Sequence, residues 1–450
     1  TTQMAFGKLM PKLIHSIPHP LSASVRVPGS KSLTNRALLI AALADGKTTL
    51  KNALFSDDSR YFANALCTLG FRVEEDEEKK EMTVWGLSGK IPATSAELFI
   101  GNAGTAARFL TAFLNLGNGE YILDGEPRMR ERPIGDLVHA LEPLGSKITS
   151  PPRSDDFSHQ EGLKPLLRRK EIYPPLKINA SGLKGGKTQI AGNVSSQYLS
   201  ALLMTAPYAE KTVEIEITTE LFSKPYVDMT ISIMQDFGVE IERDGYRYFK
   251  VSPARYTAKE IYMTESDASA ASYFFAAPAI VGGTVRVENI SRQSVQGDID
   301  FLDVLTEMGC EIKETDNGIL VTGNSSLHGV DVDMSDIPDT AQTLAAIAPF
   351  ASSPTRIRGI ASARVKETDR VSAVCNELTR LGVQVDEYED GMMIYPCEKI
   401  KSAVVQTYND HRMAMAFSLI GLRAEGIQIE NPGCVSKTFP NYFDVLDKLR

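Results

Sequence analysis

A structural repeat constrains the fold of this 450-residue chain more than any other feature. Its first marker is a large apolar residue followed by glycine and then by the apolar alternation typical of a strand. The glycines are Gly70, Gly145, Gly238, Gly309 and Gly382, at intervals of 75, 93, 71 and 73 residues. Glycine supplies the left-handed residue that ends many helices, so each marker predicts a helix followed by a strand.

Apolar helices rich in small residues form a second marker with the same period. Their predicted starts, at intervals of 73, 91, 73, 71 and 71 residues, lie near Ser32, Thr105, Ser196, Ser269, Thr340 and His411. A strand and then a second, amphipathic helix are predicted after each. The sequence therefore predicts an α/β protein with six strand–helix–strand–helix–strand–strand units, most simply two lobes of three. The repeats leave open whether the chain passes between the lobes once or twice.

The one long interval marks an insertion at residues 150–175. Its prolines, its acidic residues and the basic run Arg168-Arg169-Lys170 are typical of a loop. No function follows from this composition.

Composition excludes several classes of protein. A net charge of −9 argues against a general nucleic-acid binder, and no apolar run approaches the ~20 residues that span a bilayer. No signal-peptide pattern opens the chain. The five cysteines include no Cys-x-x-Cys pair, which favours a reducing compartment, such as the cytoplasm, over structural zinc. The six histidines do not cluster, so no metal site is expected.

The loop before the first small-residue helix places two cations, Lys31 and Arg36, in or beside the first helical turn. Unpaired N–H groups and the helix dipole make such a helix start suitable for an anion. By itself the stretch favours an ordinary capped helix with two solvated basic residues. The equivalent loops of the other repeats are also polar. We therefore expect helix starts and cations to line a cleft suited to small molecules with several phosphates or carboxylates.

Two nucleotide-binding motifs are incomplete. Gly46-Lys47-Thr48 resembles the end of a phosphate-binding P-loop, but Ala41 stands where its first glycine is required. Gly101-Asn-Ala-Gly104 is half of a dinucleotide-binding fingerprint and lacks the strand–glycine pattern of the complete motif.

Five longer motifs resemble the 5-enolpyruvylshikimate-3-phosphate (EPSP) synthase family. They begin at Pro28, Gly101, Gly125, Arg364 and Tyr408 and read Pro-Gly-Ser-Lys-Ser-Leu-Thr-Asn-Arg, Gly-Asn-Ala-Gly-Thr-Ala-Ala-Arg, Gly-Glu-Pro-Arg-Met-Arg-Glu-Arg-Pro-Ile-Gly, Arg-Val-Lys-Glu-Thr-Asp-Arg and Tyr-Asn-Asp-His-Arg-Met-Ala-Met. The match runs from about Leu21 to the C-terminus. It implies a two-lobed inside-out α/β barrel of six βαβαββ repeats, three per lobe. It also implies two crossings, so that residues 30–264 form a lobe that largely binds shikimate 3-phosphate, and residues 1–29 plus 265–450 form a lobe that closes over the cleft.

The resemblance implies a transferase of the shikimate pathway, in aromatic amino acid and chorismate biosynthesis. The enolpyruvyl (carboxyvinyl) group of phosphoenolpyruvate would pass to the 5-hydroxyl of shikimate 3-phosphate, with release of phosphate. The implied route is an addition–elimination with C–O cleavage, without metal or cofactor. The implied protein is a cytoplasmic monomer that binds these two substrates and the inhibitor glyphosate, with no nucleic-acid or membrane partner.

Two alternatives are weighed against this function. The sister transferase acting on UDP-N-acetylglucosamine usually has a cysteine in the loop corresponding to Glu126–Pro133, and none occurs here. A non-catalytic anion-binding protein on the same fold would not need all five of these residues in their motif contexts: Lys31, Asp339, Glu367, His411 and Arg412.

The resemblance also implies the residues of the site. Those for shikimate 3-phosphate are Lys31, Ser32, Arg36, Ser195, Ser196, Gln197, Ser223, Tyr226, Asp339, Ser362 and Lys366. Those for phosphoenolpyruvate are Lys31, Asn102, Gly104, Thr105, Arg108, Arg132, Gln197, Glu367, Arg370, Arg412 and Lys437. The catalytic set is Lys31, Asp339, Glu367 and His411.

Proton transfer is expected to involve Asp339 as the base toward the hydroxyl and Glu367 as the acid and base at the enolpyruvyl carbon, with Lys31 between them. The sequence does not assign these roles, because neighbouring cations lower the pKa of a carboxyl group while burial raises it. The less favoured alternative is that Glu367 is an ion-pair partner of Lys366 or Arg370.

Two positions depart from the family pattern. Ser362 stands where the family commonly has an asparagine that touches the substrate phosphate, which puts that contact in doubt. Phe109 stands where many members have proline, on the helix expected to position Gly104 and Thr105. An altered sensitivity to glyphosate is therefore expected.

Overall fold

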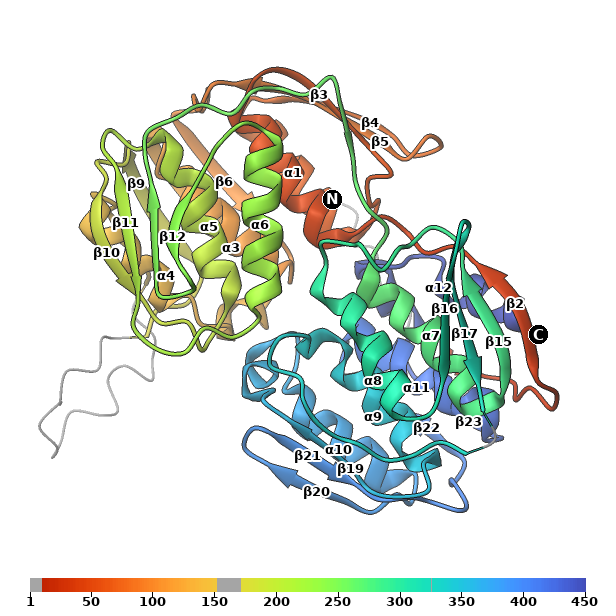
Figure 1. Cartoon of the computed structure of the whole chain (residues 1–450). Coiled ribbons are helices and arrows are strands. Elements are labelled where there is room, and N and C mark those ends of the chain that lie inside the picture. The colour runs from red at the N-terminus through yellow and green to blue at the C-terminus, as the bar shows by residue number, and fades with distance from the viewer. Residues whose placement is uncertain (1–9, 152–170, 325) are drawn as a thin grey trace, which may run out of the picture. The chain divides into compact units, whose positions relative to one another are not determined.

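Six small sheets surround two groups of helices in the computed structural model of this chain (Figure 1). The structure describes residues 10–151, 171–324 and 326–450, and most of the predicted insertion lies outside them. The chain divides into two units. The central unit is Ser32–Thr264, and the terminal unit combines the chain up to Lys31 with Glu265–Arg450.

The three sheets of the central unit share one strand order. Two parallel strands lie side by side, and a hairpin adds two antiparallel strands. The orders are β14 (Ile261–Met263), β3 (Asp45–Lys51), β5 (Glu81–Leu87), β4 (Arg72–Asp76); β6 (Ser95–Phe99), β7 (Asn118–Asp124), β9 (Leu176–Ser181), β8 (Ile148–Thr149); and β10 (Gly186–Ile190), β11 (Val213–Ile217), β13 (Tyr248–Val251), β12 (Glu242–Asp244).

The terminal unit repeats this order. Its sheets are β2 (Leu21–Val25), β15 (Gly283–Val287), β17 (Gly318–Gly323), β16 (Glu311–Thr315); β18 (Asp331–Asp333), β19 (Thr355–Arg358), β21 (Gly391–Ile394), β20 (Val385–Tyr388); and β22 (Ala403–Val405), β23 (Ile427–Ile429), β1 (Lys12–Leu13). The strand β1 is antiparallel to β23. It thus takes the position that the last strand of the repeat takes in the other five sheets.

Each repeat contributes a first helix whose residues are almost all buried. These are α1 (Lys31–Leu43), α3 (Gly104–Leu114), α5 (Ser196–Thr205), α7 (Ala268–Val281), α9 (Ala341–Ile347) and α11 (His411–Arg423). All six predicted starts are confirmed to within one residue. The second helices are α2 (Asp57–Thr68), α4 (Gly135–Leu141), α6 (Lys224–Asp236), α8 (Phe301–Glu307), α10 (Arg370–Arg380) and α12 (Tyr442–Leu446). None of the helices in the described ranges is long and apolar enough to cross a membrane.

Burial of the first helices explains the inside-out arrangement. A helix that is apolar all round can be stable only inside a core, and each unit has one hydrophobic cluster built on its three first helices and the inner faces of its sheets. The predicted left-handed glycines are also confirmed, because φ is +92°, +100°, +85°, +106° and +85° at Gly70, Gly145, Gly238, Gly309 and Gly382.

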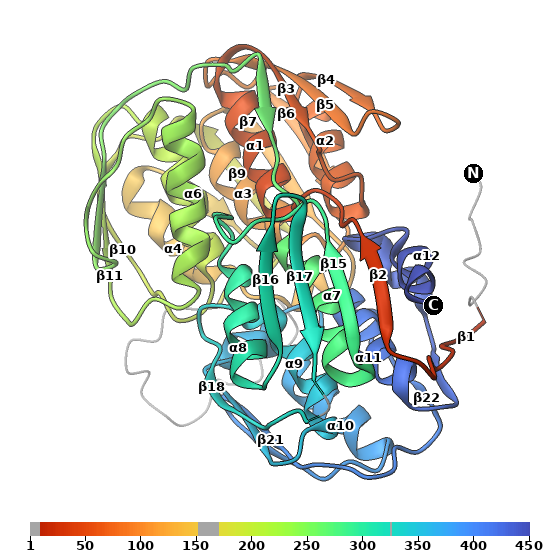
Figure 2. The ribbon, with the colours of Figure 1, turned by 45° about the vertical axis from the view of Figure 1, so that its right-hand side comes forward.

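Two strands are exchanged between repeats. In sequence β2 precedes α1, yet it pairs with β15 of the terminal unit, beside which it lies in Figure 2. Conversely, β14 precedes α7 but pairs with β3 of the central unit. The chain therefore passes between the units twice. The two connecting segments are hydrogen-bonded, since Ser30 N–H donates to the Glu265 carbonyl and Asp267 N–H to the Pro28 carbonyl, both at 2.8 Å.

Candidate active site

Arg370, the first residue of α10, is the centre of an ion-pair cluster in the terminal unit. Its side chain is 3% exposed. Its Nε donates to Asp410 Oδ2 at 2.8 Å, its Nη1 to Asp339 Oδ1 at 3.2 Å, and its Nη2 to Glu367 Oε2 at 2.8 Å. Burial lowers the pKa of Arg370, but these three carboxylates outweigh it and raise the pKa above its ordinary value.

The same carboxylates hold two further cations. Arg412 Nη2 donates to Asp339 Oδ2 at 2.7 Å, and Lys437 Nζ lies 3.4 Å from Glu367 Oε1. The ion-pair alternative for Glu367 is thus confirmed with Arg370 as partner, whereas its role in proton transfer stays a prediction. Three cations predicted to hold phosphoenolpyruvate, Arg370, Arg412 and Lys437, are thus each paired with a carboxylate predicted to transfer protons.

Asp339 lies among four cations of this cluster. Burial by itself would raise the pKa of its carboxyl group, but Arg412, Lys366, Arg370 and Lys31 outweigh burial and hold the pKa well below its ordinary value. Asp339 therefore carries a negative charge at neutral pH. The structure places two predicted residues, Lys31 and Lys366, in the electrostatic environment of this carboxylate.

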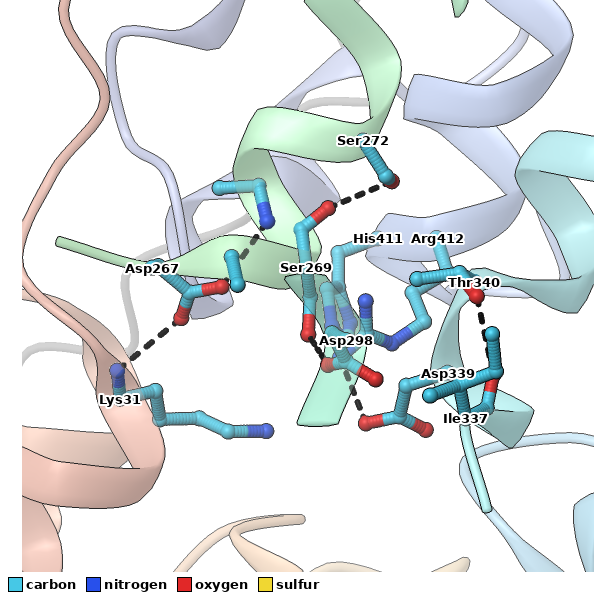
Figure 3. A network of polar contacts seen from close by, with 12 residues as sticks. Lys31, Asp267, Ser269, Ser272, Asp298, Ile337, Asp339, Thr340, His411 and Arg412 are labelled. Atoms are coloured by element: carbon cyan, nitrogen blue, oxygen red, sulfur yellow. Dashed lines mark hydrogen bonds and ion pairs between the residues drawn. The ribbon is translucent and has the colours of Figure 1, made fainter. Parts of the chain in front are cut away.

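Asp267 fixes the backbone of Lys31. The Lys31 N–H donates to Asp267 Oδ2 at 3.1 Å, while Oδ1 accepts from Ala270 N–H at 2.9 Å and so caps α7. Figure 3 shows the Lys31 side chain extending toward the carboxylates of Asp298 and Asp339. The position of this predicted catalytic lysine thus depends on a residue that the sequence analysis did not select.

His411 is fully buried at the start of α11. Its Nδ1 lies 3.5 Å from Asp410 Oδ1, and neither ring nitrogen has a hydrogen-bond partner among the described residues. Burial and the neighbouring Arg412 lower its pKa well below the ordinary value, so the ring is neutral and its proximity to Asp410 is not an ion pair. Ser362 is buried in the short helix η8 (Ala361–Val365).

In the central unit, Arg36 is 1% exposed and has no carboxylate partner among the described residues. Its four hydrogen bonds all go to uncharged oxygens: Thr230 Oγ1 at 2.8 Å, the Ser32 carbonyl at 3.0 Å, the Tyr226 carbonyl at 3.2 Å and Ser200 Oγ at 3.3 Å. Burial lowers the pKa of Arg36 to about 10. Because an uncompensated buried cation is costly, this position is suited to an incoming anion.

Hydrogen bonds also join the starts of α3 and α5. Gln197 Nε2 donates to Thr105 Oγ1 at 3.3 Å, and Ser195 caps α5 by accepting from the Gln197 N–H at 3.3 Å. The helix α6 begins after Ser223, which is buried and has a left-handed φ of +56°. Ser196 is buried as the first residue of α5.

Two buried arginines lie against the start of α3. Arg132 Nη1 donates to Asn102 Oδ1 at 3.0 Å, and Arg108 donates to the carbonyls of Gly104 at 3.3 Å and Pro133 at 3.0 Å. A Cβ on Gly104 would lie 2.4 Å from Arg132 Nη2. The Arg132 guanidinium can therefore occupy this position only because residue 104 has no side chain.

Several helices of the terminal unit are capped by carboxylates, whereas α3 and α5 of the central unit are not. In the terminal unit, α7, α10 and α11 are capped by the carboxylates of Asp267, Asp369 and Asp410. In the central unit, neither α3 nor α5 has an acidic residue in its first turn, and Ala103 offers α3 no side-chain cap. The first turns of α3 and α5 thus carry no negative charge that would repel an external anion.

Some site residues could not be selected from the sequence. Asp410 stands inside a quoted motif, but its pairing with Arg370 joins residues 40 positions apart. Ser200 and Thr230 bind Arg36 from α5 and α6 and carry no motif of their own. Among the described residues, no group of three or more His, Cys, Asp or Glu side chains is placed to hold a metal ion.

Each unit thus gathers buried cations and helix starts around positions for anions, on an α/β fold of six repeats. This combination defines an enzyme class that handles small polyanionic substrates.

Comparison with known proteins identifies the family. The EPSP synthase (3-phosphoshikimate 1-carboxyvinyltransferase) family profile matches residues 15–446. A Nostoc punctiforme protein named 3-phosphoshikimate 1-carboxyvinyltransferase is 49% identical over 430 residues, 96% of this chain and 97% of the relative. A Sulfurovum protein of the same name is 48% identical over 431 residues, 95% and 97% of the two chains. In fold, the chain is similar to a solved EPSP synthase from Acinetobacter baumannii, with a TM-score of 0.78 and 23% identity over 98% of both chains.

This chain belongs to the EPSP synthase family. The predicted inside-out α/β fold is confirmed. The reaction is the carboxyvinyl transfer of the shikimate pathway from phosphoenolpyruvate to shikimate 3-phosphate, and the alternative acting on UDP-N-acetylglucosamine is not favoured.

Proposed function

We propose that the central unit binds shikimate 3-phosphate through Arg36 and the starts of α5 and α6, and that the terminal unit supplies the proton-transfer groups. The observation that carries the assignment is Arg36, a buried guanidinium held by uncharged oxygens. Four of the five N–H donors of an arginine are used in these bonds, which leaves one Nη1–H for the substrate carboxylate. Ser195, Ser196 and Ser223 then surround the substrate phosphate.

We propose that phosphoenolpyruvate is bound by basic residues that belong to both units. Arg108 and Arg132, with Asn102, Gly104 and Thr105, come from the start of α3 and the segment facing it. Lys31, Arg370, Arg412 and Lys437 come from the terminal unit.

Asp339 acts as the base toward the 5-hydroxyl. In the absence of substrate Arg370 and Arg412 hold its pKa low, which makes it a weak base. The phosphate and carboxylate of phosphoenolpyruvate neutralise these arginines and raise the pKa of Asp339 toward the range that base catalysis needs. The base thus becomes effective when its reaction partner is bound.

Glu367 acts at C3 of the enolpyruvyl group. Glu367 takes part in its protonated form: it gives its proton to C3 while Asp339 takes the proton of the 5-hydroxyl and the 5-oxygen attacks C2, which forms a tetrahedral intermediate with a methyl group. Glu367 then takes a proton back from the methyl group as the C2–O bond to phosphate breaks, so the product regains its double bond. The proton held by Asp339 passes to the released phosphate, and both carboxyl groups return to their starting forms. Lys437, 3.4 Å from Glu367, and Arg370 stabilise the carboxylate form between these steps. In this proposal Lys31 bridges the two proton-transfer groups, and His411 supports the cluster as a neutral ring.

The inhibitor glyphosate carries a phosphonate and a carboxylate and is expected at the phosphoenolpyruvate position. Five free cysteines in the structure support a reducing compartment, and we propose a cytoplasmic monomer. Sedimentation velocity tests the oligomeric state.

Calorimetric titration of shikimate 3-phosphate without phosphoenolpyruvate tests the substrate assignment. The expected result is binding to the wild type and at least tenfold weaker binding to Arg36→Gln, because one charge-assisted contact is lost. Asp410→Asn, which changes the terminal unit only, should leave this binary affinity within twofold. Equal binding by Arg36→Gln and wild type would remove Arg36 from the substrate site.

A further inference from the structure

The aromatic ring of Phe109 lies against the guanidinium group of Arg36. The Cζ atom of Arg36 lies over the ring, 5.2 Å from its centroid. Phe109 is on α3 and Arg36 on α1, both inside the central unit. The ring is fully buried, and the guanidinium is 1% exposed.

The hydrogen bonds of Arg36 lie in the plane of its guanidinium group, so the two flat faces of the group are left for other contacts. Guanidinium N–H donors lie in the plane of the group, and four of them bind Thr230, Ser32, Ser200 and Tyr226. No carboxylate neutralises the charge within the described residues. An aromatic face attracts a cation through its quadrupole, and this attraction is strongest where water is excluded. Phe109 thus supplies a stabilising contact that the acidic residues do not.

We propose that Phe109 is a positioning residue for shikimate 3-phosphate, because it holds Arg36 in the orientation that meets the substrate carboxylate. This inference rests on the proposed role of Arg36. It predicts that Phe109 affects the affinity for shikimate 3-phosphate. The position of Phe109 on α3 by itself would suggest an effect on the binding of phosphoenolpyruvate. The two effects are separable by measurement.

The same helix offers a matched control. Phe113 lies one turn further along α3 and is also fully buried, but its ring packs against Phe71 at a centroid distance of 5.8 Å. Replacing either phenylalanine by leucine removes a buried ring from the same helix. Only Phe109→Leu removes the ring beside the cation.

The test measures the Kd of shikimate 3-phosphate by calorimetry for Phe109→Leu, Phe113→Leu, Arg36→Gln and Arg36→Gln/Phe109→Leu. We expect Phe109→Leu to weaken binding about tenfold, and Phe113→Leu to change it less than twofold at a similar loss of Tm. In the Arg36→Gln background, Phe109→Leu should add less than twofold, because no cation remains to be positioned. The KM for phosphoenolpyruvate should stay within about threefold in Phe109→Leu.

Each outcome has a defined meaning. If Phe109→Leu and Phe113→Leu have equal effects on shikimate 3-phosphate, or if Phe109→Leu changes only the phosphoenolpyruvate KM, the inference is wrong. If Arg36→Gln binds as tightly as the wild type, the proposed role of Arg36 fails instead. Should Phe109→Leu fold poorly by circular dichroism, Phe109→Met, which retains more of the side-chain length, replaces it with the same expected tenfold loss.

Discussion

The carboxylate of Asp410 accepts two hydrogen bonds from the guanidinium of Arg370, at 2.8 and 3.2 Å, and the two side chains are 0% and 3% exposed. The same carboxylate caps α11 through the Arg412 N–H at 2.9 Å. One acidic residue thus orients both arginines of the cluster, one through its side chain and the other through its backbone.

Asp410→Asn is therefore expected to impair phosphoenolpyruvate binding without touching the substrate. The amide keeps the shape but cannot hold the Arg370 guanidinium by two charge-assisted hydrogen bonds, so Arg370 loses its fixed orientation and the phosphoenolpyruvate KM should rise at least tenfold. Because a buried ion pair is broken, the free energy of unfolding should fall by about 3 kcal/mol. Steady-state kinetics and urea unfolding measure the two effects. Asp369→Asn is the control, since Asp369 also caps a helix but pairs with Arg364 at a partly exposed position. Similar kinetic losses in both variants would contradict the specific role of Asp410.

Gly104→Ala is expected to displace Arg132. The added methyl group would lie 2.4 Å from Nη2, so the guanidinium must shift away from Asn102. We expect kcat/KM for phosphoenolpyruvate to fall between about tenfold and a hundredfold, with the binary Kd of shikimate 3-phosphate unchanged. An Arg132→Lys background, which lacks the guanidinium, should reduce the effect of Gly104→Ala. A full additional loss in that background would show that the methyl group acts elsewhere.

Asp339→Asn is expected to abolish most turnover while preserving phosphoenolpyruvate affinity. The amide cannot accept the hydroxyl proton, so kcat should fall by about a hundredfold or more. It also leaves Arg370 and Arg412 without this carboxylate partner, so the phosphoenolpyruvate Kd should not rise. Rapid-quench and equilibrium-binding measurements separate the two quantities. Retained turnover would exclude Asp339 as the base.

The low pKa of Asp339 also predicts how stability depends on pH. A carboxyl group with a lower pKa in the folded state stabilises the fold fully above its unfolded pKa of about 4, and that contribution is lost as the pH falls further. The difference in unfolding free energy between wild type and Asp339→Asn should therefore be constant between pH 5 and 7 and shrink below about pH 4. A difference that does not depend on pH would contradict the ion-pair geometry.

The lowered pKa of His411 predicts a second pH dependence of the free energy of unfolding, at higher pH. Its pKa is lowered in the folded protein, so below the unfolded value of about 6.5 only the unfolded state takes up the proton. Wild-type stability should fall with decreasing pH by up to about 1.4 kcal/mol per pH unit more steeply than that of His411→Gln between pH 6.5 and 5. Urea unfolding at four pH values measures both slopes. Equal slopes would mean that the buried ring is protonated in the folded state.

The fold was largely predictable because it repeats. The glycine that ends a helix recurs five times, and the small-residue helix recurs six times. Local sequence determines both features, so helix starts such as Ser196 and His411 could be located to within one residue. The exchange of β2 and β14 was not visible in the repeats, because β2 stands before α1 in sequence as an ordinary first strand would. The pairing of β1 with β23 likewise joins the two ends of the sequence.

Residues of the candidate site could be predicted only where they belong to a recognisable sequence motif. Contacts between distant residues decide which carboxylate holds which cation, as in the pair of Asp339 with Arg412, 73 positions apart. The contact of Phe109 with Arg36 has the same character, since packing and not sequence pattern brings α3 to α1.

Phosphate release tests the central claim most directly. The protein is incubated with phosphoenolpyruvate and shikimate 3-phosphate together, with each alone, and with phosphoenolpyruvate and UDP-N-acetylglucosamine. We predict stoichiometric phosphate and an enolpyruvyl ether on the 5-oxygen, seen by proton NMR, only with the first pair. Phosphate released from phosphoenolpyruvate alone, or with UDP-N-acetylglucosamine in place of shikimate 3-phosphate, would contradict the central claim.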